Sequence, residues 1–129
     1  MAHIKKGEYL CSGDSQNKTK ITQYIIIRED LPPGVQLAQT THAARESSGN
    51  PIRIRGAPIY AVVLYAKNEK ALMKLEERLL DEEIEHKAIR EPDAPWRGAL
   101  MAIGIAPTPR ENVAHLTKKY KKAGWEKQQ

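Results

Sequence analysis

Residues 24–34 read Tyr-Ile-Ile-Ile-Arg-Glu-Asp-Leu-Pro-Pro-Gly, a β-branched apolar run followed by two prolines and a glycine. A short apolar run of this kind predicts a strand that is buried on both faces, as in a mostly parallel sheet. The prolines and the glycine predict a tight connection, because they stop the strand. A helix is expected from Val35 to Ser47, and its small residues should let it lie close against the sheet.

Strands and helices alternate along the rest of the chain. Further strands are predicted at 59–66, 86–90 and 99–106, with a short irregular strand at 52–55. A helix follows Asn68, a residue type that often caps helix N-termini. The apolar stripe of this helix contains Leu72, Leu75 and Leu79. The alternation predicts an α/β sandwich with helices on both faces of the sheet.

The last helix is expected to begin near residue 109. Thr108 can cap it, Pro109 suits the first helical position, and Glu111 completes a capping box. The strands at 86–90 and 99–106 are joined only by a loop. They form either a hairpin pair or two strands separated by a wide turn, and the sequence leaves both arrangements open.

A single domain is expected from the length of 129 residues. We assign residues 21–123 to this domain, 1–20 to a polar N-terminal tail and 124–129 to a C-terminal tail. The sequence has no apolar run near the ~20 residues of a membrane helix, and its start lacks a signal-peptide pattern. The lone Cys11 suits a reducing compartment, so we expect no membrane partner and a cytoplasmic location.

The charge of the chain is uneven. The formal net charge is +5, and residues 109–129 hold six basic and two acidic residues, a net of +4. A basic C-terminal region favours an anionic partner such as RNA. A solvated, lysine-rich helix end stabilised by the helix dipole explains the same composition. Both interpretations stay open on charge alone.

The first candidate site is the turn and helix start from Asp30 to His42. Sites in open α/β sheets gather at the carboxyl ends of strands, and a helix start offers free N–H groups. Gln39 and His42 are three residues apart, so both project from nearly the same face of the helix. His42 can act as a general base, or it can be a buried histidine bonded to the backbone.

The second candidate is the loop at 91–97. Asp93 can orient a water or a ribose hydroxyl, Trp96 can stack on a base, and Arg97 can bind phosphate. A plain turn with Trp96 packed under it is the alternative. The sequence contains no Walker phosphate loop, dinucleotide fingerprint or zinc-type spacing, so no metal or cofactor is predicted.

The first candidate site resembles class II peptidyl-tRNA hydrolases. In that family, a hydrophobic strand ends in an Arg-x-Asp-Leu turn, and a glycine-containing loop leads into a helix reading Ala-Gln-x-x-His-Ala-Ala. Residues 28–31, Gly34 and residues 38–44 match this pattern. Residues 102–107 are similar to the family's last strand, and Asp93-Ala94 is similar to its Asp-Ala loop. The resemblance spans about 21–120.

This resemblance implies a fold and a reaction. The implied fold is a three-layer α/β/α sandwich with a four-stranded mixed sheet. The implied reaction cleaves the ester between a peptide and the 3′ ribose of tRNA, which needs an activated water and a stabilised oxyanion. The implied catalytic residues are His42 and Asp93. The implied substrate-binding residues are Gln39, Arg97, Lys118 and Lys119, with tRNA or peptidyl-tRNA as the partner.

One position departs from the family pattern. The family has a functional lysine in the loop before the helix, and Val35 occupies that position here. The chain is similar to a divergent branch in which the lysine is also lacking. A non-catalytic RNA- or protein-binding module on the same fold therefore stays an alternative, as does a hydrolase of another small acylated substrate. The sequence also leaves a homodimer open.

Overall fold

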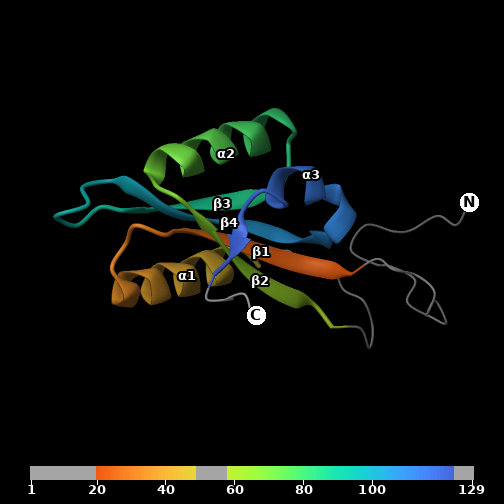
Figure 1. Cartoon of the computed structure of the whole chain (residues 1–129), viewed down its shortest axis with the longest axis horizontal. Helices are drawn as coiled ribbons and strands as arrows, with labels where there is room; N and C mark the ends of the chain where they lie inside the picture. The colour runs from red at the N-terminus through yellow and green to blue at the C-terminus, as the bar shows by residue number, and fades with distance from the viewer. Residues whose placement is uncertain (1–19, 49–57, 124–129) are drawn as a thin grey trace, which may run out of the picture.

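The computed structural model describes residues 20–48 and 58–123. Strands and helices alternate in this part of the chain, as the sequence predicts (Figure 1). Their order is β1 (Ile21–Arg28), α1 (Pro33–Ser47), β2 (Tyr60–Ala66), α2 (Glu69–Asp81), β3 (His86–Glu91), β4 (Ala99–Pro109), the 3-10 turn η2 (Arg110–Asn112), α3 (Ala114–Thr117) and β5 (Lys121–Lys122). The predicted strand at 52–55, residues 1–19 of the predicted N-terminal tail (1–20) and the predicted C-terminal tail (124–129) lie outside the described residues.

The sheet is mixed, with the strand order β3-β4-β1-β2-β5. Strand β1 pairs parallel with β2 and antiparallel with β4, while β3 and β4 form the antiparallel hairpin pair. The expectation of four strands was wrong, because β5 adds a fifth. This strand pairs antiparallel with β2 at Leu64 and Tyr65. It consists of two lysines, which carry no apolar pattern from which a strand could be predicted.

The residues of β1 alternate between two hydrophobic clusters. Ile26 belongs to the cluster that contains the leucines of α2, whereas Ile25 and Ile27 belong to the cluster that contains Ala43 of α1. All three isoleucines are at most 1% exposed. The helices α1 and α2 therefore cover opposite faces of the sheet (Figure 1). The prediction that β1 is buried on both faces is confirmed.

The predictions for the starts of the two later helices had different outcomes. The Asn68 side chain accepts a hydrogen bond from the Ala71 N–H at 3.0 Å, so this predicted cap is confirmed. The predicted helix start at residues 108–109 was wrong. Strand β4 continues to Pro109 because Thr108 pairs with Thr22 of β1. The Thr108 hydroxyl accepts a bond from the Asn112 side chain instead of capping a helix.

Helix α1 lies very close to β4 at Gly104. A Cβ atom added to Gly104 would lie 2.5 Å from the Ala43 carbonyl oxygen and 2.8 Å from the Ser47 Cβ. The Ser47 hydroxyl donates to the Ala43 carbonyl at 2.7 Å and accepts from Gln23 of β1 at 2.8 Å. The small residues of α1 and the absent side chain of Gly104 thus fix the spacing between this helix and the sheet.

We predict that Gly104→Ala lowers the free energy of unfolding by about 1–3 kcal/mol, because the added methyl must displace helix backbone. The measurement is urea denaturation followed by circular dichroism. Gly34→Ala is the matched control, since nothing lies within 4 Å of a Cβ at that position. Equal denaturation midpoints for the two variants would contradict the close packing described above.

Candidate active site between helix α1 and the β3–β4 loop

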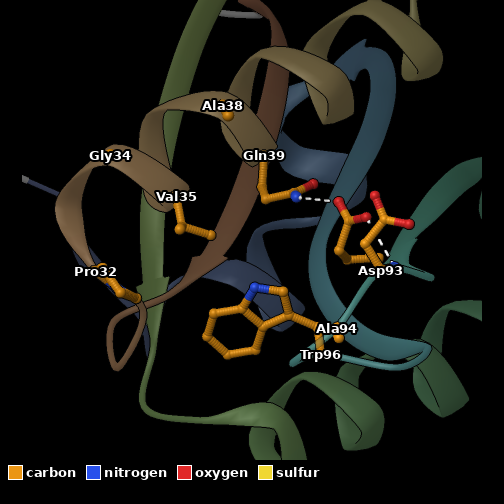
Figure 2. Close-up of a pocket in the computed structure, with 9 residues that line it drawn as sticks. Pro32, Gly34, Val35, Ala38, Gln39, Asp93, Ala94 and Trp96 are labelled. Atoms are coloured by element: carbon orange, nitrogen blue, oxygen red, sulfur yellow. Dashed lines mark hydrogen bonds between the residues drawn. The ribbon is translucent and has the colours of Figure 1, made fainter.

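The centre of the candidate site is a hydrogen bond between two segments that are distant in the sequence. The amide nitrogen Nε2 of Gln39, in α1, donates to the Oε1 of Glu91, the last residue of β3, at 3.0 Å (Figure 2). Gln39 is 5% exposed. The carboxylate fixes the orientation of this amide, because the reverse orientation would place two oxygens against each other.

The other end of the Gln39 amide has no partner. Its Oε1 is buried and forms no hydrogen bond, and it is the one such side-chain atom among the described residues. A buried carbonyl oxygen without a donor costs about 1–3 kcal/mol, so an unsatisfied acceptor of this kind calls for an explanation. A ligand that brings a hydrogen-bond donor would satisfy it.

The β3–β4 loop folds back on Glu91. The Gly98 N–H donates to the Glu91 carbonyl at 2.6 Å, and the Trp96 N–H donates to the Asp93 carbonyl at 2.9 Å. Gly98 has a φ of +90°, in the region that favours glycine. The second carboxylate oxygen of Glu91 accepts from the Asp93 N–H at 3.1 Å. The Asp93 backbone is therefore held directly beside the Gln39–Glu91 pair.

An open pocket of about 460 Å³ lies between α1 and this loop. That volume is within the range of small-ligand sites. Its polar lining residues are Gln39, Glu91 and Asp93, and the others are Pro32, Gly34, Val35, Ala38, Ala94 and Trp96. Figure 2 shows the Gln39 side chain reaching from α1 toward the carboxylates, with the Trp96 ring below them. Thus one end of the pocket is acidic and the other is apolar.

The start of α1 has two free backbone donors, at Gly34 and Val35, and both residues line the pocket. Pro32 and Pro33 have no N–H, and no side chain caps the helix. The N–H groups of Gly34 and Val35 have no partner within the described residues, as expected for the first turn of a helix. Gln36 anchors this turn, because its side chain donates to the Leu31 carbonyl at 2.8 Å and accepts from Tyr65 at 3.0 Å.

An ion pair between the buried Arg28 and the exposed Asp30 lies beside the loop. Arg28, at the end of β1, donates through Nε and Nη2 to both carboxylate oxygens of Asp30, at 2.9 and 3.1 Å. Its Nη1 donates to the Leu100 carbonyl at 3.1 Å. The guanidinium carbon lies 5.9 Å from the centre of the Trp96 ring. Asp30 therefore neutralises the cation that supports Trp96.

The family model described as peptidyl-tRNA hydrolase PTH2 matches residues 21–123, which is most of the chain. The chain belongs to the peptidyl-tRNA hydrolase PTH2 family. No curated protein matches it.

The matched region holds every candidate residue of this PTH2 family member, and three of them, Gln39, Asp93 and Trp96, line the same pocket. His42 is exposed, one turn further along α1, and its Nδ1 lies 3.2 Å from the Arg45 side chain. It is therefore not a buried histidine. Arg97 follows Trp96 in the loop but does not line the pocket. Lys118 and Lys119 are exposed in the turn that follows α3.

Glu91 lies at the start of the predicted candidate loop at 91–97, but no role was assigned to it from the sequence. Its role depends on the pairing of β3 with β4 and on the approach of α1, and neither is a local property. The adjacent Arg90 bonds to Glu76 of α2 at 2.9 and 3.1 Å, and this carboxylate raises the pKa of Arg90. Arg90 and Glu91 are thus directed to different helices.

The described part of this PTH2 family member contains no cluster of three or more metal-ligating side chains. It also contains no helix long and apolar enough to cross a membrane.

We predict that Asp30→Asn lowers the free energy of unfolding by about 1–2 kcal/mol, because the buried Arg28 guanidinium loses a charged partner. Urea denaturation measures this change. Glu46→Gln is the control, since Glu46 pairs with Arg45 at 3.6 Å and both side chains are more than half exposed. Its effect should stay within about 0.5 kcal/mol. A larger loss in Glu46→Gln than in Asp30→Asn would contradict the structural role of the Arg28–Asp30 pair.

Proposed function

We propose that this chain hydrolyses the ester that joins a peptide to the 3′ ribose of tRNA. The observation that carries the proposal is the convergence of Gln39 and Asp93 on one pocket in a chain of the PTH2 family. The buried amide offers an unsatisfied acceptor, and the carboxylate is exposed beside it. An ester hydrolase needs these two functions, because it must orient the acyl group and activate a water.

Asp93 is the proposed general base. It takes a proton from a water whose oxygen attacks the ester carbonyl carbon. The carbonyl oxygen gains negative charge, which the free N–H groups of Gly34 and Val35 can stabilise at the helix start. The bond to the ribose 3′ oxygen then breaks, and that oxygen receives the proton from Asp93. Because Val35 has no charge, oxyanion stabilisation at this helix start depends on backbone donors.

His42 and the basic residues are assigned to the surroundings of this pocket. His42, exposed one turn beyond Gln39, would act from the rim, by exchanging protons with solvent or by contacting the substrate. Arg97 would bind phosphate near the loop. Lys118 and Lys119 would contact the tRNA backbone farther away, where neutralised phosphates make binding salt-dependent. Cytoplasmic location and tRNA as the partner belong to this proposal, and a homodimer stays an open alternative.

We predict that purified wild-type protein releases the N-blocked amino acid from N-blocked aminoacyl-tRNA and that Asp93→Asn lowers kcat/KM about 100-fold or more. His42→Ala should lower it less, because His42 does not line the pocket. Glu77→Gln is the control for a carboxylate-to-amide change, since Glu77 is exposed on α2 and should behave as wild type.

Two outcomes would count against the proposal in different ways. Absence of turnover by wild-type protein above the spontaneous rate would reject the hydrolase function. Equal activity of wild type and Asp93→Asn would reject Asp93 as the base and leave the hydrolase function standing.

The second candidate function is a non-catalytic RNA- or protein-binding module, and the presence of Val35 at the family's lysine position favours it. An RNA-binding module of this kind should bind deacylated tRNA with an affinity that falls steeply with salt. Tight, salt-sensitive binding without turnover would support this candidate over the hydrolase.

A further inference from the structure

We infer that the indole ring of Trp96 is the stacking surface for the terminal adenine base of tRNA, so that this ring positions the ribose whose ester is cleaved. The inference rests on the proposed ester hydrolysis at the same pocket and specifies how the pocket binds the leaving nucleoside.

Trp96 is held in place by backbone hydrogen bonds within the loop. Its N–H donates to the Asp93 carbonyl at 2.9 Å, and its carbonyl accepts from the Ala99 N–H at 3.0 Å. The N–H of the next residue, Arg97, donates to the same Asp93 carbonyl at 3.1 Å. The loop therefore fixes the direction from which the indole ring enters the pocket.

A buried cation supports one side of the indole ring. The Arg28 guanidinium carbon lies 5.9 Å from the centre of the ring. Arg28 is buried and does not line the pocket, whereas Trp96 is half-buried and lines it. Asp30 and the Leu100 carbonyl hold the guanidinium in this position by hydrogen bonds. One part of the ring therefore packs against the protein, and another part is open to a ligand in the pocket.

The pocket has room for a flat group beside this ring. Gly34, Ala38 and Ala94 line it with little or no side chain. Val35 also lines it and, like Trp96, packs against the hydrophobic cluster that contains Ile25 and Ile27. Figure 2 shows the indole ring between the helix start that carries Val35 and the loop segment that carries Ala94. This space suits a nucleobase, because bases of every kind stack on aromatic side chains.

A fixed aromatic wall suits the constant part of the substrate better than its variable part. The amino-acid side chain next to the ester differs from one peptidyl-tRNA to another, whereas every tRNA ends in the same adenosine. A ring that is already held in place loses little freedom when a ligand binds, so more of the stacking energy contributes to affinity. We therefore assign the base, and not the acyl side chain, to Trp96.

The residues beside Trp96 match the groups beside a terminal base. Arg97 follows it directly and is exposed, so its guanidinium can bind the 5′ phosphate of the terminal nucleotide. On the other side, Asp93 is joined to Trp96 by the backbone hydrogen bond and also lines the pocket. A base stacked on Trp96 therefore places its ribose next to Asp93, the proposed general base.

The first test changes the terminal base and keeps the rest of the substrate. The substrates are two N-acetylphenylalanyl esters of one acceptor-stem RNA, whose last nucleotide is either adenosine or a ribose without a base. Each rate is corrected for spontaneous hydrolysis. We expect kcat/KM for the adenosine ester to be higher by about 10-fold or more, as is typical when a base stacks on an aromatic side chain.

Variants of Trp96 show whether the indole ring causes this preference. Trp96→Leu should reduce it to about 2-fold or less, whereas Trp96→Tyr should keep most of it, because tyrosine also stacks on bases. Tyr60→Leu is the matched control and should keep the wild-type preference. Tyr60 is an exposed aromatic residue at the start of β2, at the end of the sheet away from the pocket.

The second test measures binding without turnover. Adenosine 5′-monophosphate copies the terminal nucleotide of the deacylated product. Calorimetry should show that it binds more tightly than ribose 5-phosphate, which lacks the base, and more tightly than adenosine, which lacks the phosphate. Trp96→Leu should remove the first difference, and Arg97→Gln should remove the second. In Trp125→Phe, Trp96 is the remaining tryptophan, and adenosine 5′-monophosphate should quench its fluorescence by stacking on the ring.

Three outcomes would overturn the inference and leave the hydrolase function standing. The first is an equal kcat/KM of wild type for the two esters. The second is an equal loss in Trp96→Leu for both esters, which would mean that the ring only supports the loop. The third uses the N-acetylglycyl ester of the adenosine-ending RNA. A lower preference of Trp96→Leu for phenylalanyl over glycyl, with an unchanged base preference, would assign the ring to the acyl side chain.

Absence of hydrolysis of every ester would instead reject the proposed function. The nucleotide site would still be supported if adenosine 5′-monophosphate bound and quenched the Trp96 fluorescence. It would be rejected as well if wild type bound this nucleotide no better than ribose 5-phosphate. That comparison uses wild-type protein and does not depend on the stability of any Trp96 variant.

Discussion

The structure depends on the burial of β1, whose side chains pack toward α1 on one face of the sheet and toward α2 on the other. Ile26 packs toward α2, whereas Ile25 and Ile27 pack toward α1. Parallel pairing of β1 with β2 and antiparallel pairing with β4 place this strand inside the sheet. The chain leaves β1 at Arg28 and must turn at once into α1, so the start of that helix is fixed at the carboxyl end of the central strand. The candidate pocket is a consequence of that geometry.

The features that were predicted correctly are local or periodic. The apolar run in β1 and the N-cap at Asn68 each depend on a few neighbouring residues, and both are present. The features that were missed depend on contacts between distant segments. Thr108 and Pro109 have the composition of a helix start, but pairing with Thr22 and Ile21 of β1 extends β4 through them. At these two residues, strand pairing with β1 determined the structure, and the local helix-start pattern did not.

The residues of the candidate site also fall into two groups, those that local motifs predict and those that only the fold reveals. Gln39 and Asp93 were identified from motifs, and the fold brings both to one pocket. Glu91 joins them from the same predicted loop, although its bond to Gln39 could not be predicted from the sequence. Its position requires the β3–β4 hairpin, the loop closure at Gly98 and the approach of α1. The exposure of His42 follows from the rotation of α1, which directs Gln39, Ala43 and Ser47 toward the sheet.

The contact at Gly104 couples two segments that the chain places far apart. The space that a side chain would need at 104 is occupied by the Ala43 carbonyl and the Ser47 side chain, and Ser47 is also bonded to Gln23 of β1. Four positions on three elements therefore share one small volume. During evolutionary divergence, they are expected to change together, because a larger residue at any one of them requires compensation at another. The solvent-facing residues of the helix that carries Gln39 can therefore be substituted freely, whereas the residues that set its distance from the sheet cannot.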